Sequence, residues 1–417
     1  MATATKEITL LKGQASLLSN FKDTVLAAVA GTGGGKTMLG YWWLHSRMEA
    51  YPGNTWGMAE PTYSMLSKII LISSDPNRPT LEQYFRQVGH HPKLHVVDRI
   101  METDFGKVYL GSADNPDSMQ GAAVKGYWLD EGGQMKVLAY DTARQRVSMM
   151  RGQVIITTTP YKMGWLKTEV VDKGGTDGIA VEQWRSIDRP GYPRESYEAE
   201  RRRLPPWRFA MLYDARFEQP AGLIYSAFDE RVCLIDRFPI PKEWLIYSGH
   251  DFGGANPAAV FYAQDPATGN FYLFNEYLPG AGRSTYEHTQ EFKKIVAGYN
   301  VIKRVGGSHQ EGEIRQGYAA HGWPINEPKI NRVEAQIDKV IGMHQLNKVF
   351  VFKDMRNYLD EKRSFSRKLD DTSSPTEEIE DEAKFHLMAS ERYLLSDFTP
   401  ETVVPNRPRV KKSAYAF

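Results

Sequence analysis

The segment from Val25 to Thr37 constrains the fold of this chain more than any other. It runs from the apolar stretch VLAAV through AGTGGGKT into a helical stretch, KTMLGYWWLHSRMEA. A strand, a glycine-rich turn and a helix in this order bring backbone N–H groups together at a helix start, where they bind phosphate. The segment therefore predicts a phosphate-binding loop in an α/β domain.

Each residue of this loop has an expected role. Lys36 is expected to reach the terminal phosphates and Thr37 to ligate Mg²⁺, although Ala30 stands where the strict motif begins with glycine. The glycines expected to let backbone N–H groups converge on phosphates are Gly31, Gly33, Gly34 and Gly35. A turn with a purely structural use is the alternative, which the Lys-Thr pair disfavours.

A second apolar strand, GYWLDE, ends in two carboxylates. Next to a phosphate loop, the first carboxylate of such a pair holds the Mg²⁺ shell and the second polarises the attacking water. Asp130 is therefore the expected metal ligand and Glu131 the expected catalytic base. The plainer alternative is a solvated strand end.

A third strand, QVIITTTP, ends in three threonines before Pro160. Their hydroxyls are candidates to sense the γ-phosphate and to relay hydrolysis to a neighbouring domain, although a β-branched strand end is the alternative. Three arginines lie just before this strand and are candidates to supply transition-state charge, in cis or to a neighbouring subunit: Arg144, Arg146 and Arg151. Arginines on an exposed helix face are the commoner case.

The strand pattern predicts two domains. Short strands alternate with helices in the first half, which favours a largely parallel, helix-covered sheet. Three strands joined by tight turns open the second half and predict an antiparallel meander. The expected divisions are a domain over 1–219, a linker or subdomain over 220–243, a domain over 244–400 and a flexible basic tail over 401–417. The acidic stretch 370–382 is expected to be a mobile surface loop.

Composition limits the classes of partner. The 52 Lys plus Arg against 51 Asp plus Glu give a net charge of +1, so any contact with nucleic acid must come from local patches. A single cysteine excludes an internal disulfide framework and suits a reducing compartment. No apolar run is long enough to span a bilayer, which predicts a soluble intracellular protein.

Taken in chain order, four segments resemble the ATPase of the phage terminase large-subunit family: LKGQASLL, AGTGGGKT, GSADNPDSMQGAAVKGYWLDE and TTTP. The resemblance implies an N-terminal P-loop ATPase of the ASCE type with a mostly parallel sheet. It also implies that Gln14 contacts adenine and that Thr158 and Thr159 form the motif that couples hydrolysis to motion. One departure is Thr32, where many members carry a basic residue.

The resemblance continues into the second half and implies a ribonuclease-H-like nuclease domain with a mixed sheet, in which clustered carboxylates hold divalent ions. Asp251, in YSGHDFGG, matches the first-strand aspartate, and Glu311 is the expected replacement where Ser308 stands in place of an aspartate. His386 keeps its family place as a further ligand, but Ala389 occupies the place of the third aspartate. Glu276 is a fallback ligand, and helical geometry turns Glu391 away from His386.

By the same resemblance, the expected function is ATP-driven packaging of viral DNA with cleavage of concatemers. The implied cofactors are ATP and Mg²⁺, or Mn²⁺ at the nuclease site. The implied partners are double-stranded DNA, the portal protein and the small terminase subunit, with a ring of identical chains on the procapsid. The expected location is the host cytoplasm, without a membrane and without a place in the mature virion.

Two alternatives stay open. One is a nuclease-inactive translocase or helicase, which the loss of the third aspartate favours; the other is a nucleotide-binding assembly scaffold. Contact with DNA would be made through phosphates, without reading bases. The candidate bases for this contact are Arg201, Arg202, Arg203, Arg208, Lys162 and Lys167. A solvated helix face is the alternative for them.

Overall fold

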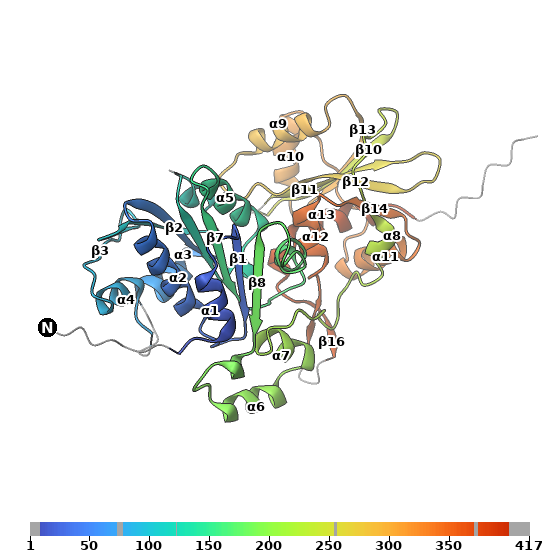
Figure 1. Cartoon of the computed structure of the whole chain (residues 1–417). Coiled ribbons are helices and arrows are strands. Elements are labelled where there is room, and N and C mark those ends of the chain that lie inside the picture. Colours follow the sequence, from blue (N-terminus) through green and yellow to red (C-terminus); the bar gives the residue numbers. More distant parts are fainter. Residues whose placement is uncertain (1–8, 73–77, 122, 254–256, 371–373, 400–417) are drawn as a thin grey trace, which may run out of the picture. The chain divides into compact units, whose positions relative to one another are not determined.

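The computed structural model describes residues 9–72, 78–121, 123–253, 257–370 and 374–399 (Figure 1). The chain forms two compact units: unit 1 is Met1–Gly222 with Leu369–Pro375, and unit 2 is Leu223–Lys368 with Thr376–Phe417. The predicted linker 220–243 is not a separate element, because Tyr225 and Cys233 are buried in the core of unit 2. The predicted tail 401–417 lies outside the described residues.

Unit 1 is built on an eight-stranded sheet in the order β3-β4-β5-β2-β6-β7-β1-β8. The strands from β5 to β8 pair in parallel, and β3 and β4 add an antiparallel edge. The strands are β1 (Val25–Ala30), β2 (Asn54–Glu60), β3 (Lys93–His95), β4 (Ile100–Thr103), β5 (Gly106–Ser112), β6 (Gly126–Asp130), β7 (Gln153–Thr158) and β8 (Ile179–Trp184). One strand, β7, separates β1 from β6, which is the order expected of an ASCE-type sheet.

Helices cover both faces of this sheet, because its central strands are buried on both sides. Leu26 of β1 packs with Trp43 in one core, whereas the next residue, Ala27, packs with Tyr140 in the other. The helices of unit 1 are α1 (Lys12–Ser19), α2 (Lys36–Ala50), α3 (Tyr63–Met65), α4 (Leu81–Gln87), α5 (Val137–Ser148), α6 (Arg194–Arg203) and α7 (Pro206–Leu212). The parallel, helix-covered sheet predicted from the sequence is confirmed.

Unit 2 contains a six-stranded mixed sheet in the order β13-β10-β11-β12-β14-β9. The strands are β9 (Leu234–Ile235), β10 (Leu245–Asp251), β11 (Ala258–Gln264), β12 (Phe271–Tyr277), β13 (Asn300–Gly306) and β14 (Val349–Phe352). β10, β11 and β12 pair antiparallel in sequence order, whereas β13, β14 and β9 pair in parallel with their neighbours. The predicted meander is therefore confirmed, within a mixed sheet.

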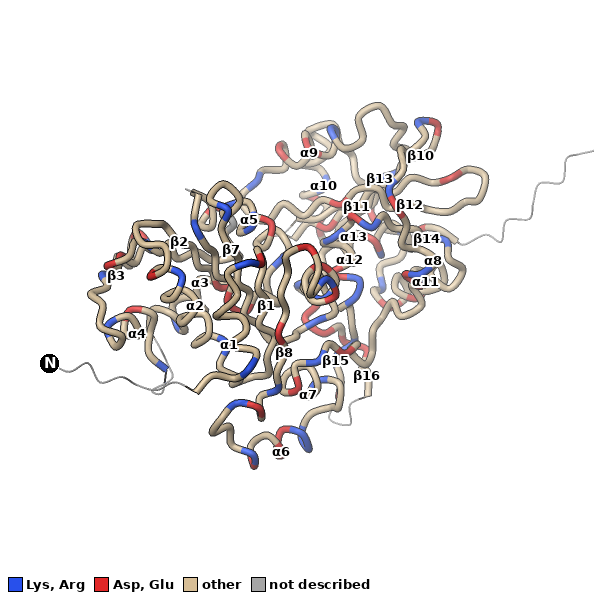
Figure 2. Tube along the Cα trace, in the orientation of Figure 1, with Lys and Arg blue, Asp and Glu red and all other residues tan. Residues whose placement is uncertain are grey.

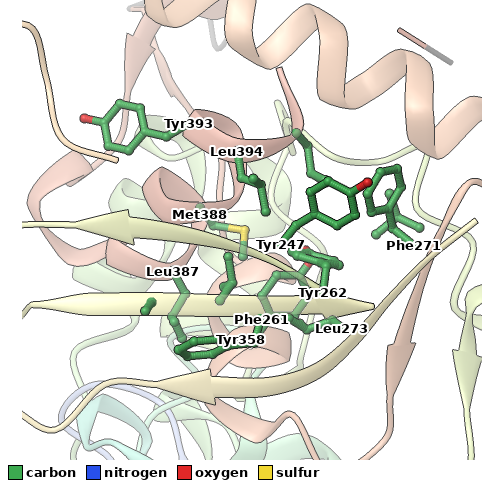
Figure 3. Packing of buried hydrophobic residues seen from close by; sticks show 14 of the residues in the cluster. Tyr247, Phe261, Tyr262, Phe271, Leu273, Tyr358, Leu387, Met388, Tyr393 and Leu394 are labelled. Atoms are coloured by element: carbon green, nitrogen blue, oxygen red, sulfur yellow. The ribbon is translucent and has the colours of Figure 1, made fainter. Parts of the chain in front are cut away.

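A late helix, α13 (His386–Leu395), packs on this sheet against β10 and β11. Leu387, Met388 and Leu394 point into the aromatic core beside Phe261 and Tyr262 (Figure 3). The other helices of unit 2 are α8 (Glu230–Cys233), α9 (Thr285–Ile295), α10 (Gly312–Ala320), α11 (Val333–Gln345) and α12 (Arg356–Lys362). In the part of the chain that the structure describes, no helix is long and apolar enough to cross a membrane.

The prediction of a mobile loop over 370–382 is wrong for Pro375–Ile379, which form a strand, whereas 371–373 lie outside the described residues. β15 (Arg367–Leu369) and β16 (Pro375–Ile379) form a two-stranded sheet. The Thr376 hydroxyl donates to the Lys368 carbonyl at 2.9 Å, and the Lys368 ammonium pairs with Glu378 at 3.0 Å. Cross-strand contacts of this kind hold strands whose composition alone is typical of a loop.

The contact between α13 and β10 supplies a stability test. A Cβ added at Gly249 of β10 would lie 2.1 Å from the Ser390 carbonyl oxygen of α13. We expect Gly249→Ala to lower the free energy of unfolding by about 1–3 kcal/mol, because helix and strand must move apart. Urea unfolding of the full chain measures this. Gly342→Ala on α11, where an added Cβ meets nothing within 4 Å, is the control; equal loss in both variants would contradict the packing argument.

Candidate functional site

The phosphate loop joins β1 to α2 in unit 1 as predicted. Gly33 and Gly35 adopt φ values of +72° and +85°, which residues with a Cβ rarely adopt. Lys36 begins α2, and its ammonium donates to the Gly31 carbonyl at 3.2 Å. The Gly34 carbonyl accepts from the Trp184 indole at 2.9 Å, which fixes the loop against β8. The loop is thus held open around the start of a helix.

Asp130 lies at the centre of the site. Its carboxylate accepts from the Thr37 hydroxyl at 3.0 Å and from the Thr157 hydroxyl at 2.5 Å. The side chain is fully buried, and burial raises the pKa of Asp130 while the two hydroxyl hydrogen bonds oppose that rise. A hydroxyl and a carboxylate brought together in this way fit the oxygen ligands that Mg²⁺ takes beside a nucleotide.

Glu131 follows in a left-handed conformation with φ +51°, which is costly for a residue with a Cβ and is typical of functional turns. Its carboxylate lies 3.9 Å from the Lys36 ammonium and accepts from the Tyr161 hydroxyl at 3.0 Å. Burial raises the pKa of Glu131, and Lys36 opposes this rise. The expected base is therefore held between the phosphate loop and the segment that follows β7.

The three threonines at the end of β7 have different contacts. Thr157 holds Asp130, as described above. The Thr158 hydroxyl accepts from the backbone N–H of Gly133 at 2.9 Å and so holds the turn that follows Glu131. The Thr159 hydroxyl is buried and has no hydrogen-bond partner among the described residues. Of the two predicted coupling residues, Thr159 alone lines the cavity described next.

A cavity of about 430 Å³ opens over this loop. It is lined by Gly33, Gly35, Lys36, Thr37, Glu131 and Thr159, together with Gln14, Thr9, Thr32, Met38, Trp42, Arg78, Tyr161, Arg189 and Pro190. The side-chain oxygen of Gln14 accepts from the Leu11 N–H at 3.0 Å, and its amide nitrogen faces Gly35. The volume suits a small ligand, and the lining brings the predicted phosphate and base residues together.

The predicted nuclease residues of unit 2 are brought together in part. The His386 imidazole at the start of α13 lies 2.8 Å from the Asp251 carboxylate at the end of β10. The Glu311 carboxylate instead accepts from the Ser308 N–H at 2.5 Å. Asp251 and Glu311 both lie close enough to Tyr393 to add to the rise that burial causes in its pKa. These residues therefore share one neighbourhood without forming a ligand set.

Two further carboxylates considered from the sequence have structural roles. Glu276 accepts from the backbone N–H groups of Asn357 and Tyr358 at the start of α12, at 3.0 and 2.6 Å, so the fallback metal ligand is a helix cap. Glu391 is buried and pairs with Lys362 at 2.7 Å, on the side of α13 away from His386, as expected. Over residues 9–399, with the gaps given above, no three His, Cys, Asp or Glu side chains cluster to hold a metal ion.

No family model and no curated protein matches this chain in sequence. The solved structures to which it is similar include phage large terminases. The large terminase of a thermophilic bacteriophage in complex with ADP is 17% identical, over 92% of this chain and 97% of that one, with a TM-score of 0.47. The Thermus phage P74-26 large terminase ATPase domain is 19% identical, over 50% and 94%, with a TM-score of 0.43.

The P22 large terminase nuclease domain is 17% identical to this chain, over 42% of this chain and 91% of that one, with a TM-score of 0.34. Identities this low assign no role to single residues. Each role given below therefore comes from the contacts within this chain.

Sequence reasoning missed four residues in or beside this cavity. Tyr161, Arg78 and Arg189 line it, and Glu60 lies next to Asp130. Glu60 ends β2, the neighbour of β6, and is fully buried. Burial raises its pKa well above the ordinary range, and the nearby Asp130 and Glu131 add to the rise. The place of Glu60 at the carboxyl end of a parallel strand could have indicated a site residue, because ligands bind at that edge of such sheets. Arg144, Arg146 and Arg151, named as candidates from the sequence, do not line this cavity. Their action on a neighbouring subunit stays a prediction.

A pH effect follows from His250, which precedes Asp251 on β10. Burial lowers the pKa of His250 to about 3, with a smaller contribution from Arg304. The unfolded residue titrates near pH 6.5, so the unfolded chain binds the extra proton first as the pH falls. The contribution of His250 to stability is therefore complete above pH 6.5 and is lost towards pH 3. We expect this loss to be about 1.4 kcal/mol per pH unit between pH 6 and pH 4.

Urea unfolding at several pH values checks this expectation. The His250→Gln variant should lose this part of the pH dependence. His309→Gln, at an exposed histidine of the same unit, should keep it. An unchanged slope in His250→Gln would show that other groups cause the acid sensitivity.

Proposed function

We propose that this chain is the large subunit of a phage terminase, in which unit 1 hydrolyses ATP to drive the translocation of double-stranded DNA into a procapsid. The observation that carries the proposal is the contact of Thr37 and Thr157 with Asp130, beside Glu131 and Lys36, at the edge of one cavity. A P-loop hydroxyl, an acidic strand end and a base in this arrangement are what nucleotide hydrolysis needs.

The proposed steps are those of the chain's own residues. The loop and Lys36 bind the phosphates, and Gln14, which lines the same cavity, contacts the adenine base. Thr37 and Asp130 would hold Mg²⁺, which would neutralise charge on the transferred phosphoryl group. Glu131 orients and polarises the attacking water, and Tyr161 fixes the Glu131 carboxylate in place. Thr159, with an unpaired hydroxyl among the described residues, responds to the γ-phosphate.

Replacement of the catalytic base, Glu131, tests the proposal and also distinguishes an ATP-hydrolysing motor from an assembly scaffold. We expect Glu131→Gln to lower ATP turnover by about a hundredfold or more, because the water is no longer polarised. ATP binding should persist, because the loop is intact. Turnover is followed by phosphate release and binding by equilibrium titration, with Glu49→Gln, at an exposed site on α2, as the control.

Absence of ATP turnover in the unmodified protein, with binding retained, would favour the scaffold. Turnover unchanged in Glu131→Gln would exclude this residue as the base.

Unit 2 has two candidate functions. The first is metal-dependent cleavage of concatemeric DNA by Asp251, Glu311 and His386. The second is a nuclease-inactive domain of a translocase, which binds DNA without cutting it. The engaged Glu311 carboxylate, the alanine at position 389 and the lack of a three-residue ligand cluster among the described residues support the second. The residues present do not fit a two-metal site, so the proposed mechanism contains no cleavage step.

Plasmid DNA with Mg²⁺ or Mn²⁺ distinguishes these candidates. We expect the unmodified protein and Asp251→Ala to leave the plasmid intact. We expect Ala389→Asp to nick or linearise it, because the new carboxylate lies one helical turn from His386, towards Asp251. Asp338→Ala, at an exposed site on α11, is the control. Cutting by the unmodified protein that Asp251→Ala abolishes would restore the first candidate.

The proposed contact with DNA has little support at the basic residues that the sequence offered as candidates. Arg203 pairs with Glu200 on α6, and Lys167 pairs with Asp172. Basic and acidic residues both occur along α6 (Figure 2). This pairing supports the alternative of a solvated helix face. Contact of Arg201, Arg202, Arg208 and Lys162 with DNA stays a prediction. We also propose the portal protein and the small terminase subunit as partners, a ring of identical chains on the procapsid, and the host cytoplasm as the location.

A further inference from the structure

Negative charge would accumulate in the nucleotide cavity when ATP is bound. The phosphate chain of ATP carries several negative charges. The Glu131 carboxylate lines the same cavity, and the buried Asp130 carboxylate lies behind its wall, hydrogen-bonded to Thr37. The phosphate loop itself supplies one cationic side chain, Lys36, which lies against Glu131 and the Gly31 carbonyl. Transition states of phosphoryl transfer are stabilised by additional cations, most often arginine. The other cationic residues of the lining therefore matter.

Arg189 is one of these residues, and its position is fixed by the fold. Its guanidinium donates to the Gly33 carbonyl of the phosphate loop at 2.9 Å. The preceding Ser186 hydroxyl donates to the Thr32 carbonyl at 2.7 Å, and Tyr192 packs so closely that a Cβ on Gly33 would lie 2.9 Å from its ring. The segment 186–192 thus wraps the loop and keeps Arg189 beside the N–H groups that bind phosphate.

Arg78 lines the same cavity. It lies just before α4 and is distant from Arg189 in sequence. Its positive charge lowers the pKa values of Glu60 and Tyr41 against the rise that burial causes, which places it near the end of β2 and the first half of α2. Its Nε is buried and has no hydrogen-bond partner in the part of the chain that the structure describes. A half-buried guanidinium that lines a polar cavity, with its Nε unpaired, is poised for an anionic ligand.

We propose that Arg78 and Arg189 bind the phosphate chain of ATP from within the same polypeptide, so that each nucleotide site carries its own arginine charge. The inference rests on the proposed ATP hydrolysis and deepens it. Arg189 acts from the side of the phosphate loop, and Arg78 acts from the side of β2. The bidentate geometry of a guanidinium suits both places, because phosphate offers paired oxygen acceptors.

The first test compares single replacements with matched controls. Arg78→Ala and Arg189→Ala should each lower ATP turnover or ATP affinity by about tenfold or more, with smaller losses for the lysine variants. The control for Arg189 is Arg185→Ala, at an exposed residue that directly precedes this segment and pairs with Asp188. The control for Arg78 is Arg86→Ala, at a residue that pairs with Glu82 on α4. Both controls should stay within about twofold of the unmodified protein.

The second test asks whether the arginines act within one chain or between chains. The double variant Arg78→Ala/Arg189→Ala is mixed with Glu131→Gln over a range of protein concentrations. Action within one chain predicts no recovery of ATP turnover, because no site in the mixture has both the base and the arginines. Recovery that grows with concentration would show arginines acting on a neighbouring subunit and would overturn the proposal.

The outcomes also separate this inference from the proposed function. If the unmodified protein neither binds nor hydrolyses ATP, both fail together. If it hydrolyses ATP and the Arg78→Ala and Arg189→Ala variants do so at the same rate and affinity, this inference alone fails.

Discussion

The buried carboxylate of Asp130 is the interaction on which the rest of unit 1 depends. It joins three elements that are distant in sequence: the start of α2 through Thr37, the end of β6 through its own backbone, and the end of β7 through Thr157. A carboxylate taken out of water is stable only when its oxygens are satisfied. The order β6-β7-β1 supplies those partners, because the carboxyl ends of neighbouring parallel strands meet at one edge of the sheet.

In unit 2, too, several carboxylates have hydrogen-bond or ion-pair partners, but these partners serve the fold. Glu276 caps α12, Glu391 pairs with Lys362, and Glu311 holds the Ser308 N–H. A helix cap or a buried ion pair stabilises a fold, but it occupies the oxygens that a metal ion needs. In unit 1, by contrast, Asp130 is hydrogen-bonded to Thr37, which lines the cavity, and Glu131 lines the cavity itself.

Much of this arrangement was predictable from the sequence, for reasons that particular residues make clear. The phosphate loop, Asp130 and Glu131 follow from local patterns, because strand, turn and helix order fixes which groups meet. Cys233 and Tyr225 were misplaced in a linker, because short strands such as β9 carry little periodicity. Arg189 and Tyr161 gave no local signal, since their contacts with Gly33 and Glu131 are made across the fold. The hairpin of β15 and β16 was missed because acidic composition outweighed its cross-strand pairs.

The end of β7 has a consequence for how this protein can evolve. Thr157, Thr158 and Thr159 are adjacent in sequence, yet one holds the buried carboxylate, one holds the turn after the base, and one faces the cavity. Insertion or deletion of a single codon here would exchange all three tasks at once. The length of this segment is therefore constrained by all three contacts at once, and we expect insertions and deletions to occur elsewhere in the domain.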